Sequence, residues 1–124
     1  MKKDKIRVVC VKPFEKPYSM LLDNNLASLQ KAVGGRIAFN PVDGFVAALI
    51  NDEGKLLNLP PNRIIADKNG TIIDYYAGTF YIVGPPDEEA ENTSLTFEEA
   101  EHYIEMFSNT VLFTNYDITE LYGL

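Results

Sequence analysis

The sequence predicts an α+β domain in which two helices pack on a mostly antiparallel sheet of five or six strands. Two stretches have apolar residues at helical spacing, together with residues that favour helix ends. Short runs of β-branched and aromatic residues lie between them, and two connections contain the Asp-Gly or Asn-Gly pair of a hairpin turn, at residues 43–44 and 69–70. The length of 124 residues fits one small domain over residues 1–124.

The first expected element is a strand over residues 5–12, which is rich in β-branched residues. Pro13 and Pro17 then break the chain into a loop. The single cysteine, Cys10, lies in this strand, where we expect it to be a small buried apolar residue. One cysteine also excludes an intrachain disulfide bond.

A first helix is expected near residues 22–33. Ser19 or Asp23 can cap its start, and Gly34-Gly35 ends it because glycine adopts the left-handed conformation without strain. The apolar residues recur at three- and four-residue spacing, which places them on one helical face. This face consists of Leu22, Leu26, Leu29, Ala32 and Val33.

The middle of the chain supplies the other strands of the expected sheet. Each run is short and bounded by turn residues, as strands usually are. Two consecutive prolines, Pro60 and Pro61, keep the segment 56–63 out of a central strand, so it is expected to be a loop. The expected strands cover residues 36–42, 45–50, 64–66, 71–76 and 79–83.

A second helix is expected near residues 97–108, after an acidic linker over residues 85–95. The sequence Thr96-Phe97-Glu98-Glu99 fits a capping box, in which the cap and the residue three positions later satisfy each other's backbone groups. Its apolar face is formed by Ala100, Tyr103, Ile104 and Phe107. A C-terminal tail over residues 115–124 carries aromatic and aliphatic side chains that can dock on the domain.

The distribution of charge is the main indication of function. The first 68 residues hold all eleven Lys and Arg with seven Asp and Glu, a net charge of +4, whereas the last 56 residues hold eleven Asp and Glu and no basic residue, a net charge of −11. Such an acidic surface repels nucleic acid and attracts basic partners. The residues expected to bind a partner are Asp87, Glu88, Glu89, Glu91, Glu98, Glu101 and Glu105.

The sequence shows no catalytic or metal-binding constellation. His102 is the only histidine, lies within the second expected helix, and has no nucleophile indicated near it. One histidine and one cysteine do not make a standard structural zinc site, and the acidic run lacks the spacing of a calcium-binding loop. The glycine pair follows a helix, whereas phosphate-binding glycines precede one. We therefore expect no enzyme, no cofactor and no metal.

A ligand site is the alternative to the acidic surface. The loop Leu59-Pro60-Pro61-Asn62-Arg63 presents a guanidinium and an amide near several aromatic residues, and such groups can hold a base or a phosphate. Equally, Asn62 can stabilise the turn while Arg63 pairs with a carboxylate. The residues of this alternative site are Arg36, Asn62, Arg63, Tyr76 and Phe80.

Four blocks of the sequence carry a resemblance to a known family. They are Asn25-Leu26-x-x-Leu29-Gln30-x-x-Val33-Gly34-Gly35-x-Ile37, Asn51-x-Glu53-Gly54-Lys55-Leu56-x-x-Leu59-Pro60-x-Asn62-Arg63, Gly78-Thr79-Phe80-x-Ile82-Val83-Gly84 and Ser94-Leu95-Thr96-x-Glu98-Glu99. Over about residues 5–108 the chain resembles the uncharacterised domain-of-unknown-function family 3846. Ala38 stands where members tend to carry an acidic residue. Because two blocks contain them, Asn62 and Arg63 are expected to lie close to Gly34-Gly35.

The resemblance implies an accessory protein of phages, plasmids or conjugative elements of Gram-positive bacteria. We therefore expect a non-enzymatic binding protein that inhibits or modulates a host protein, including one of a defence system, through its acidic surface. The alternative is a small-ligand binder that sequesters a nucleotide signal. The net charge of −7 favours a soluble protein of the bacterial cytoplasm that contacts neither membrane nor nucleic acid directly. Assembly into a homo-oligomer stays open.

Overall fold

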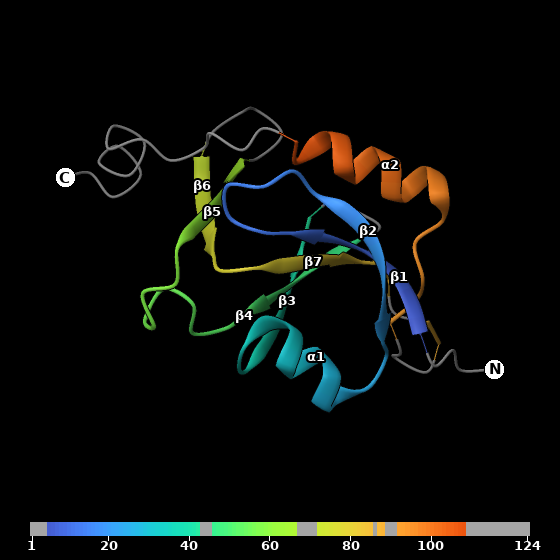
Figure 1. Ribbon diagram of the computed structural model, residues 1–124, viewed down its shortest axis with the longest axis horizontal. Helices are drawn as coiled ribbons and strands as arrows, with labels where there is room; N and C mark the ends of the chain where they lie inside the picture. Colours follow the sequence, from blue (N-terminus) through green and yellow to red (C-terminus); the bar gives the residue numbers. More distant parts are fainter. Residues whose placement is uncertain (1–4, 43–45, 67–71, 86, 89–91, 109–124) are drawn as a thin grey trace.

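The five-stranded antiparallel sheet at the centre of the molecule confirms the expected α+β class (Figure 1). The computed structural model describes residues 5–42, 46–66, 72–85, 87–88 and 92–108. In these residues, the elements are β1 (Lys5–Val11), β2 (Tyr18–Asp23), α1 (Leu26–Val33), β3 (Ile37–Pro41), β4 (Ala47–Asn51), β5 (Pro61–Ala66), β6 (Ile72–Ala77), β7 (Phe80–Val83) and α2 (Phe97–Met106).

The strand order of the main sheet is β2-β1-β7-β4-β3, and every neighbouring pair is antiparallel. The last strand among the described residues, β7, therefore lies between β1 and β4, with Ile82 opposite both Val9 and Ala48. The strands β5 and β6 form a separate two-stranded antiparallel sheet, which lies at one end of the molecule in Figure 1.

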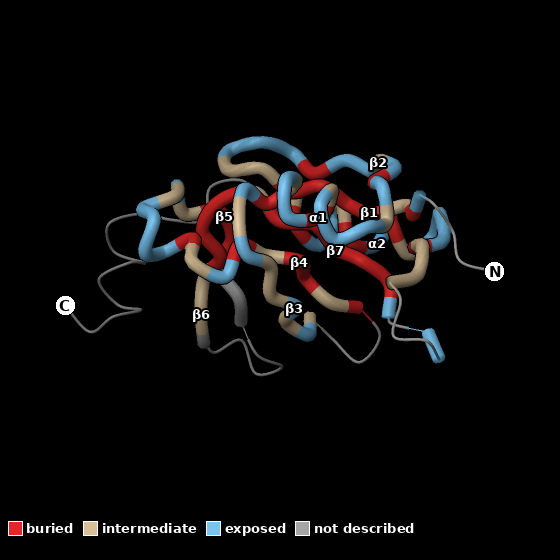
Figure 2. The backbone as a smooth tube through the Cα atoms, turned by 90° about the horizontal axis from the view of Figure 1, so that it is seen from below, coloured by how far each residue is buried: buried red, intermediate tan, exposed pale blue. Residues whose placement is uncertain are grey.

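The two helices cover opposite faces of the main sheet (Figure 1). Alternate residues of a strand point to opposite faces, so Val9 of β1 packs in the α2-side core while Val8 and Cys10 pack in the α1-side core. Figure 2 shows the central strands as largely buried. Burial on both faces explains why β1 reads as a continuous apolar run rather than an alternating one.

The start of the first helix differs from the expectation. Residues 18–23 form the edge strand β2, so Leu22 is buried from a strand opposite Ile6 and not from a helix. The helix begins at Leu26, and the side chain of its N-cap Asn25 accepts a hydrogen bond from the Ser28 amide at 2.9 Å. The four-residue spacing from Leu22 to Leu26 suggested one helix, but backbone pairing with β1 decides the conformation of the segment.

The ends of both helices agree with the sequence. Gly34 has φ of 83° at the C-cap of α1, the left-handed conformation expected of it. In α2, the Thr96 hydroxyl accepts from the Glu99 amide at 3.1 Å, and a Glu99 carboxylate oxygen accepts from the Thr96 amide at 2.8 Å. Among the described residues, neither α1 nor α2 has the length and apolar character that crossing a membrane requires.

The strand β5 starts earlier than the prolines suggested. It begins at Pro61 and places Arg63 opposite Tyr76 of β6, so the expected loop over residues 56–63 ends sooner. Proline is tolerated there because it is the first residue of a strand in a two-stranded sheet. The expected turns at residues 43–44 and 69–70 and the tail over residues 115–124 lie outside the described residues.

Candidate functional site

The solvent side of α2 carries a continuous acidic stripe. Glu98, Glu101, His102 and Glu105 are all exposed, and their spacing of three and four residues places them on one face of the helix. The opposite side packs on the sheet through the buried Ala100, Tyr103 and Phe107. We call the four exposed residues the acidic face of α2. The structure thus brings together three of the seven acidic residues expected to bind a partner.

Two of the three carboxylates on this face, Glu101 and Glu105, destabilise the helix that carries them. Glu105 lies in the last turn of α2, where the helix dipole favours cations, and that turn has no basic residue. Glu101 and Glu105 are four residues apart, a spacing at which like charges repel. The ion pairs found among the described residues join β-strands and turns instead, at Lys5–Asp23, Arg36–Asp52 and Lys55–Asp74.

The linker before α2 is tied to the sheet at its two described ends. The Gly84 amide donates to the Thr93 carbonyl at 3.1 Å, and the Thr93 hydroxyl donates to the Pro85 carbonyl at 2.6 Å. Between these ends, Asp87 and Glu88 are exposed. The remaining expected partner-binding residues, Glu89 and Glu91, lie outside the described residues.

The alternative ligand site is largely built into the protein interior. Arg63 is 1% exposed and Asn62 is 2% exposed. The Arg63 guanidinium donates through Nε to the Phe107 carbonyl at 3.0 Å, through Nη2 to the Glu15 carbonyl at 2.8 Å, and through Nη1 to Asn62 Oδ1 at 2.7 Å. The Asn62 amide in turn donates to the carbonyls of Val11 and Gly78, both at 2.9 Å.

These contacts show what the Asn62-Arg63 pair does. Arg63 pairs with backbone carbonyls rather than with the carboxylate that the sequence suggested, and so joins β5 to the end of α2 and to the loop after β1. Burial lowers the pKa of Arg63, but an arginine side chain stays charged in proteins. A cation at the carboxyl end of a helix is also favourable, because the last carbonyls carry partial negative charge.

The other residues of the alternative site fall into two groups. Tyr76 and Phe80 are buried in the α2-side core, with ring centroids 4.9 Å apart in an edge-to-face arrangement. Burial raises the pKa of the Tyr76 hydroxyl above its ordinary value. Arg36 is exposed, and its guanidinium lies 3.9 Å from an oxygen of Asp52.

The Gly34-Gly35 pair lies against Asn51. The Asn51 amide donates to the Val33 carbonyl at 3.1 Å and its oxygen accepts from the Glu53 amide at 2.8 Å. A Cβ atom on Gly35 would lie 3.2 Å from the Asn51 amide nitrogen. Asn51 and the glycines belong to two of the family-like blocks, so these blocks do meet in space, but through Asn51 rather than through the Asn62 expected from the sequence.

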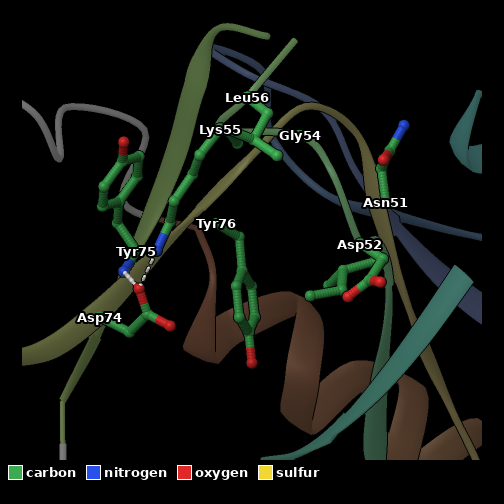
Figure 3. Close-up of a pocket in the computed structure, with 10 residues that line it drawn as sticks. Asn51, Asp52, Gly54, Lys55, Leu56, Asp74, Tyr75 and Tyr76 are labelled. Atoms are coloured by element: carbon green, nitrogen blue, oxygen red, sulfur yellow. Dashed lines mark hydrogen bonds and ion pairs between the residues drawn. The ribbon is translucent and has the colours of Figure 1, made fainter. Parts of the chain in front are cut away.

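A hollow of about 430 Å³ lies between the end of β4, the turn after it and β6 (Figure 3). We call it the β4–β6 hollow; it is lined by Ile50, Asn51, Asp52, Gly54, Lys55, Leu56, Asp74, Tyr75, Tyr76 and Ala77. Lys55 forms an ion pair with Asp74, and its ammonium group lies 4.5 Å from the centre of the Tyr75 ring. Of the residues predicted to bind a ligand, Tyr76 lines the hollow.

Sequence reasoning did not identify the hollow. The signal available to it was the block containing Glu53-Gly54-Lys55, but the pairing partner Asp74 lies 19 residues beyond Lys55. The described residues hold no group of three or more His, Cys, Asp or Glu side chains placed to bind a metal ion. His102 is exposed and lies edge-on to the ring of Tyr103, with 4.8 Å between centroids.

Comparisons with known proteins identify a family for this chain. Neither the curated proteins nor the solved structures contain a match to the chain. A family model described as a domain of unknown function, DUF3846, matches residues 6–108, which include both described helices and nearly every described strand residue. The chain therefore belongs to the DUF3846 family, as its sequence blocks indicated.

Proposed function

We propose that the protein is a non-enzymatic binding protein that engages a basic surface of a partner protein through the acidic face of α2. The single observation that carries this proposal is the exposed stripe of Glu98, Glu101 and Glu105 on one helical face. A surface of one sign of charge attracts a partner of the opposite sign and speeds its association.

The unfavourable position of the charges supports a functional role. Glu98 and Glu99 lie in the first turn of α2, where carboxylates favour the helix, so their presence has a structural explanation. Glu101 and Glu105 have no such explanation, because the first repels the second and the second opposes the helix dipole. Residues that lower stability without a structural benefit are typical of sites kept for function.

The partner is proposed to be a host protein with a basic, nucleic-acid-binding groove. The acidic face of α2 presents carboxylates along a rod, as a nucleic acid presents phosphates along its backbone, so it can occupy such a groove and exclude the nucleic acid. The mobile-element context implied by the sequence blocks makes a defence protein one candidate for the host partner.

The proposal is tested with two variants of equal charge. Glu101→Gln/Glu105→Gln neutralises the acidic face, whereas Glu15→Gln/Glu53→Gln removes the same charge from other elements. Each variant and the wild type serve as bait in host extract, and the affinity of any protein captured is then measured with purified components at two salt concentrations.

A partner of the acidic face should bind the wild type and the Glu15→Gln/Glu53→Gln control equally. Its affinity for the Glu101→Gln/Glu105→Gln variant should fall, chiefly through a slower association rate. The affinity of the wild type should also fall by about tenfold between low and high salt, because exposed charges are screened over about 10 Å at 0.1 M. Equal binding by both variants would refute the proposal.

The geometry gives less support to the alternative, a small-ligand binder that sequesters a nucleotide signal. Asn62, Arg63, Tyr76 and Phe80 are buried, and the hydrogen-bonding groups of Asn62 and Arg63 are engaged within the protein. Arg36 alone is exposed among the five residues of that site. Mass spectrometry of small molecules released from protein purified from host cells would revive this alternative if a nucleotide were found.

A further inference from the structure

We infer that the β4–β6 hollow is a binding site for a guanidinium or primary amine group, presented either by a small molecule or by a side chain of a protein. This site is separate from the acidic face of α2, and the inference does not depend on the function proposed for that face. Three properties of the hollow carry it: a fixed wall, a net negative lining and aromatic rings beside the carboxylates.

The wall of the hollow is fixed by the turn that follows β4. Within it, the Gly54 amide donates to the Asn51 carbonyl at 3.2 Å, the Leu57 amide to the Glu53 carbonyl at 2.9 Å, and the Leu59 amide to the Gly54 carbonyl at 3.0 Å. A Cβ atom on Gly54 would lie only 2.7 Å from the Ala77 carbonyl oxygen. Only glycine therefore allows the turn to lie directly on the end of β6. A preformed wall lowers the entropy lost when a ligand binds.

The charged groups that line the hollow are two carboxylates and one ammonium, a net charge of −1. Asp74 is already engaged, because its Oδ1 accepts from Lys55 Nζ and from the Tyr75 amide at 2.7 Å. Asp52 has a weaker ion pair. Its Oδ2 lies 3.9 Å from Nη2 of Arg36, and the Arg36 side chain is 74% exposed. Asp52 is thus the carboxylate that an incoming cation can reach and pair with.

The protein already contains one example of the expected recognition. The Lys55 ammonium is held between the Asp74 carboxylate and the face of the Tyr75 ring, which is the geometry of a cation–π contact. Figure 3 shows the Tyr76 ring between Asp74 on one side and Asp52 on the other. Asp52 and Tyr76 line the same hollow, so its lining combines a second carboxylate with a second aromatic residue.

An anionic ligand does not fit this lining. Lys55, the cation that lines the hollow, is paired with Asp74, so a phosphate would have to break this ion pair and face Asp52 and Asp74. The chain as a whole is also negative, at −7. The volume of about 430 Å³ is at the lower end of the range for small-ligand pockets, so the hollow suits one extended side chain or a small amine.

The test uses two probes that differ only in charge. N-acetyl-arginine amide carries the guanidinium, and N-acetyl-citrulline amide has nearly the same shape without the charge. Each is titrated into the full-length, isotope-labelled protein while the backbone amide signals are followed by NMR. The arginine derivative should give saturable shifts around the hollow with a Kd on the order of 1 mM, and the citrulline derivative should not.

Three variants separate the hollow from general electrostatic attraction. Asp52→Asn should weaken binding of the arginine derivative by about fivefold or more. Asp23→Asn, which removes an equal charge from a similar ion pair on β2, should leave binding unchanged. Lys55→Gln should tighten binding, because it makes the lining more negative. The spectrum of each free variant shows whether it is folded.

The inference is overturned if both probes bind equally, if no shift saturates, if Asp23→Asn acts like Asp52→Asn, or if Lys55→Gln fails to tighten binding. The source of the cation is decided by a third probe, a seven-residue peptide with arginine at its centre. Binding at least about tenfold tighter than that of the free derivative assigns the hollow to a protein side chain, and equal binding assigns it to a small molecule.

Discussion

Replacement of Arg63 by alanine should destabilise the protein severely while leaving its surface unchanged. The side chain is 1% exposed and supplies donors to the Phe107 carbonyl, the Glu15 carbonyl and Asn62 Oδ1. A buried acceptor left without a donor costs about 1–3 kcal/mol. Phe107 and Asn62 are buried, whereas Glu15 is exposed and water can replace its donor. The two buried acceptors that lose a donor are the Phe107 carbonyl and Asn62 Oδ1. At about 2 kcal/mol each, the free energy of unfolding should fall by about 4 kcal/mol.

A loss of this size is large for a domain of 124 residues, whose total stability is expected to be about 6–18 kcal/mol at 0.05–0.15 kcal/mol per residue. The corresponding fall in Tm is about 15 °C. Urea denaturation followed by circular dichroism measures the change directly. Arg63→Lys keeps the charge but not the planar arrangement of donors, so it should lose about half as much.

Arg36→Ala is the matched control for this measurement. Arg36 is exposed and has one long ion pair with Asp52, so its removal should change stability by less than about 0.5 kcal/mol. The reasoning is wrong if Arg63→Ala loses less than about 1 kcal/mol, or if Arg36→Ala is as damaging. Either result would mean that the buried guanidinium does not hold β5, the end of α2 and the loop after β1 together.

Three further outcomes follow from the structure. Gly54→Ala should lower stability by more than about 1 kcal/mol in denaturation experiments, because its Cβ would lie 2.7 Å from the Ala77 carbonyl oxygen. Thr96→Ala should cost about 1 kcal/mol through loss of the helix cap, whereas Thr96→Ser should be nearly neutral. Burial raises the pKa of Tyr76 and of Tyr81 in the folded state. Their contribution to stability is therefore complete below the unfolded tyrosine pKa of about 10 and is lost as the pH rises above that value. Tm measured as a function of pH should fall at alkaline pH in the wild type, and it should fall less in a variant with both tyrosines replaced by Phe.

The sequence was sufficient for the features that depend on neighbouring residues. The capping box at Thr96 and the left-handed Gly34 follow from local backbone chemistry, and both are confirmed. The expected helix near residues 22–33 started too early, and the strand over residues 18–23 was not predicted, because Leu22 fits a helical stripe as well as a strand. Pairing with β1, a tertiary effect, selects the strand.

The candidate sites also combine features that depend on neighbouring residues with features that depend on residues distant along the chain. The sequence predicted that Glu98, Glu101 and Glu105 belong to an acidic surface around the second helix, and the helix then fixes these side chains on one face. The role of Arg63 was not predictable, since its carbonyl partners lie 44 and 48 residues away along the chain. The local sequence shows that Arg63 follows two prolines and an asparagine. The packing of elements that are distant along the chain decides which carbonyl groups Arg63 binds.

The position of β7 has a consequence for synthesis on the ribosome. This strand lies at the centre of the sheet, between β1 and β4, yet it is made after the other four strands of that sheet. Until Val83 has left the exit tunnel, the apolar edges of β1 and β4 have no partner between them. Pairing of segments about 70 residues apart also makes folding slow. The nascent chain therefore exposes two unpaired apolar strand edges until β7 is available. Chaperone binding during this period would protect the chain from aggregation.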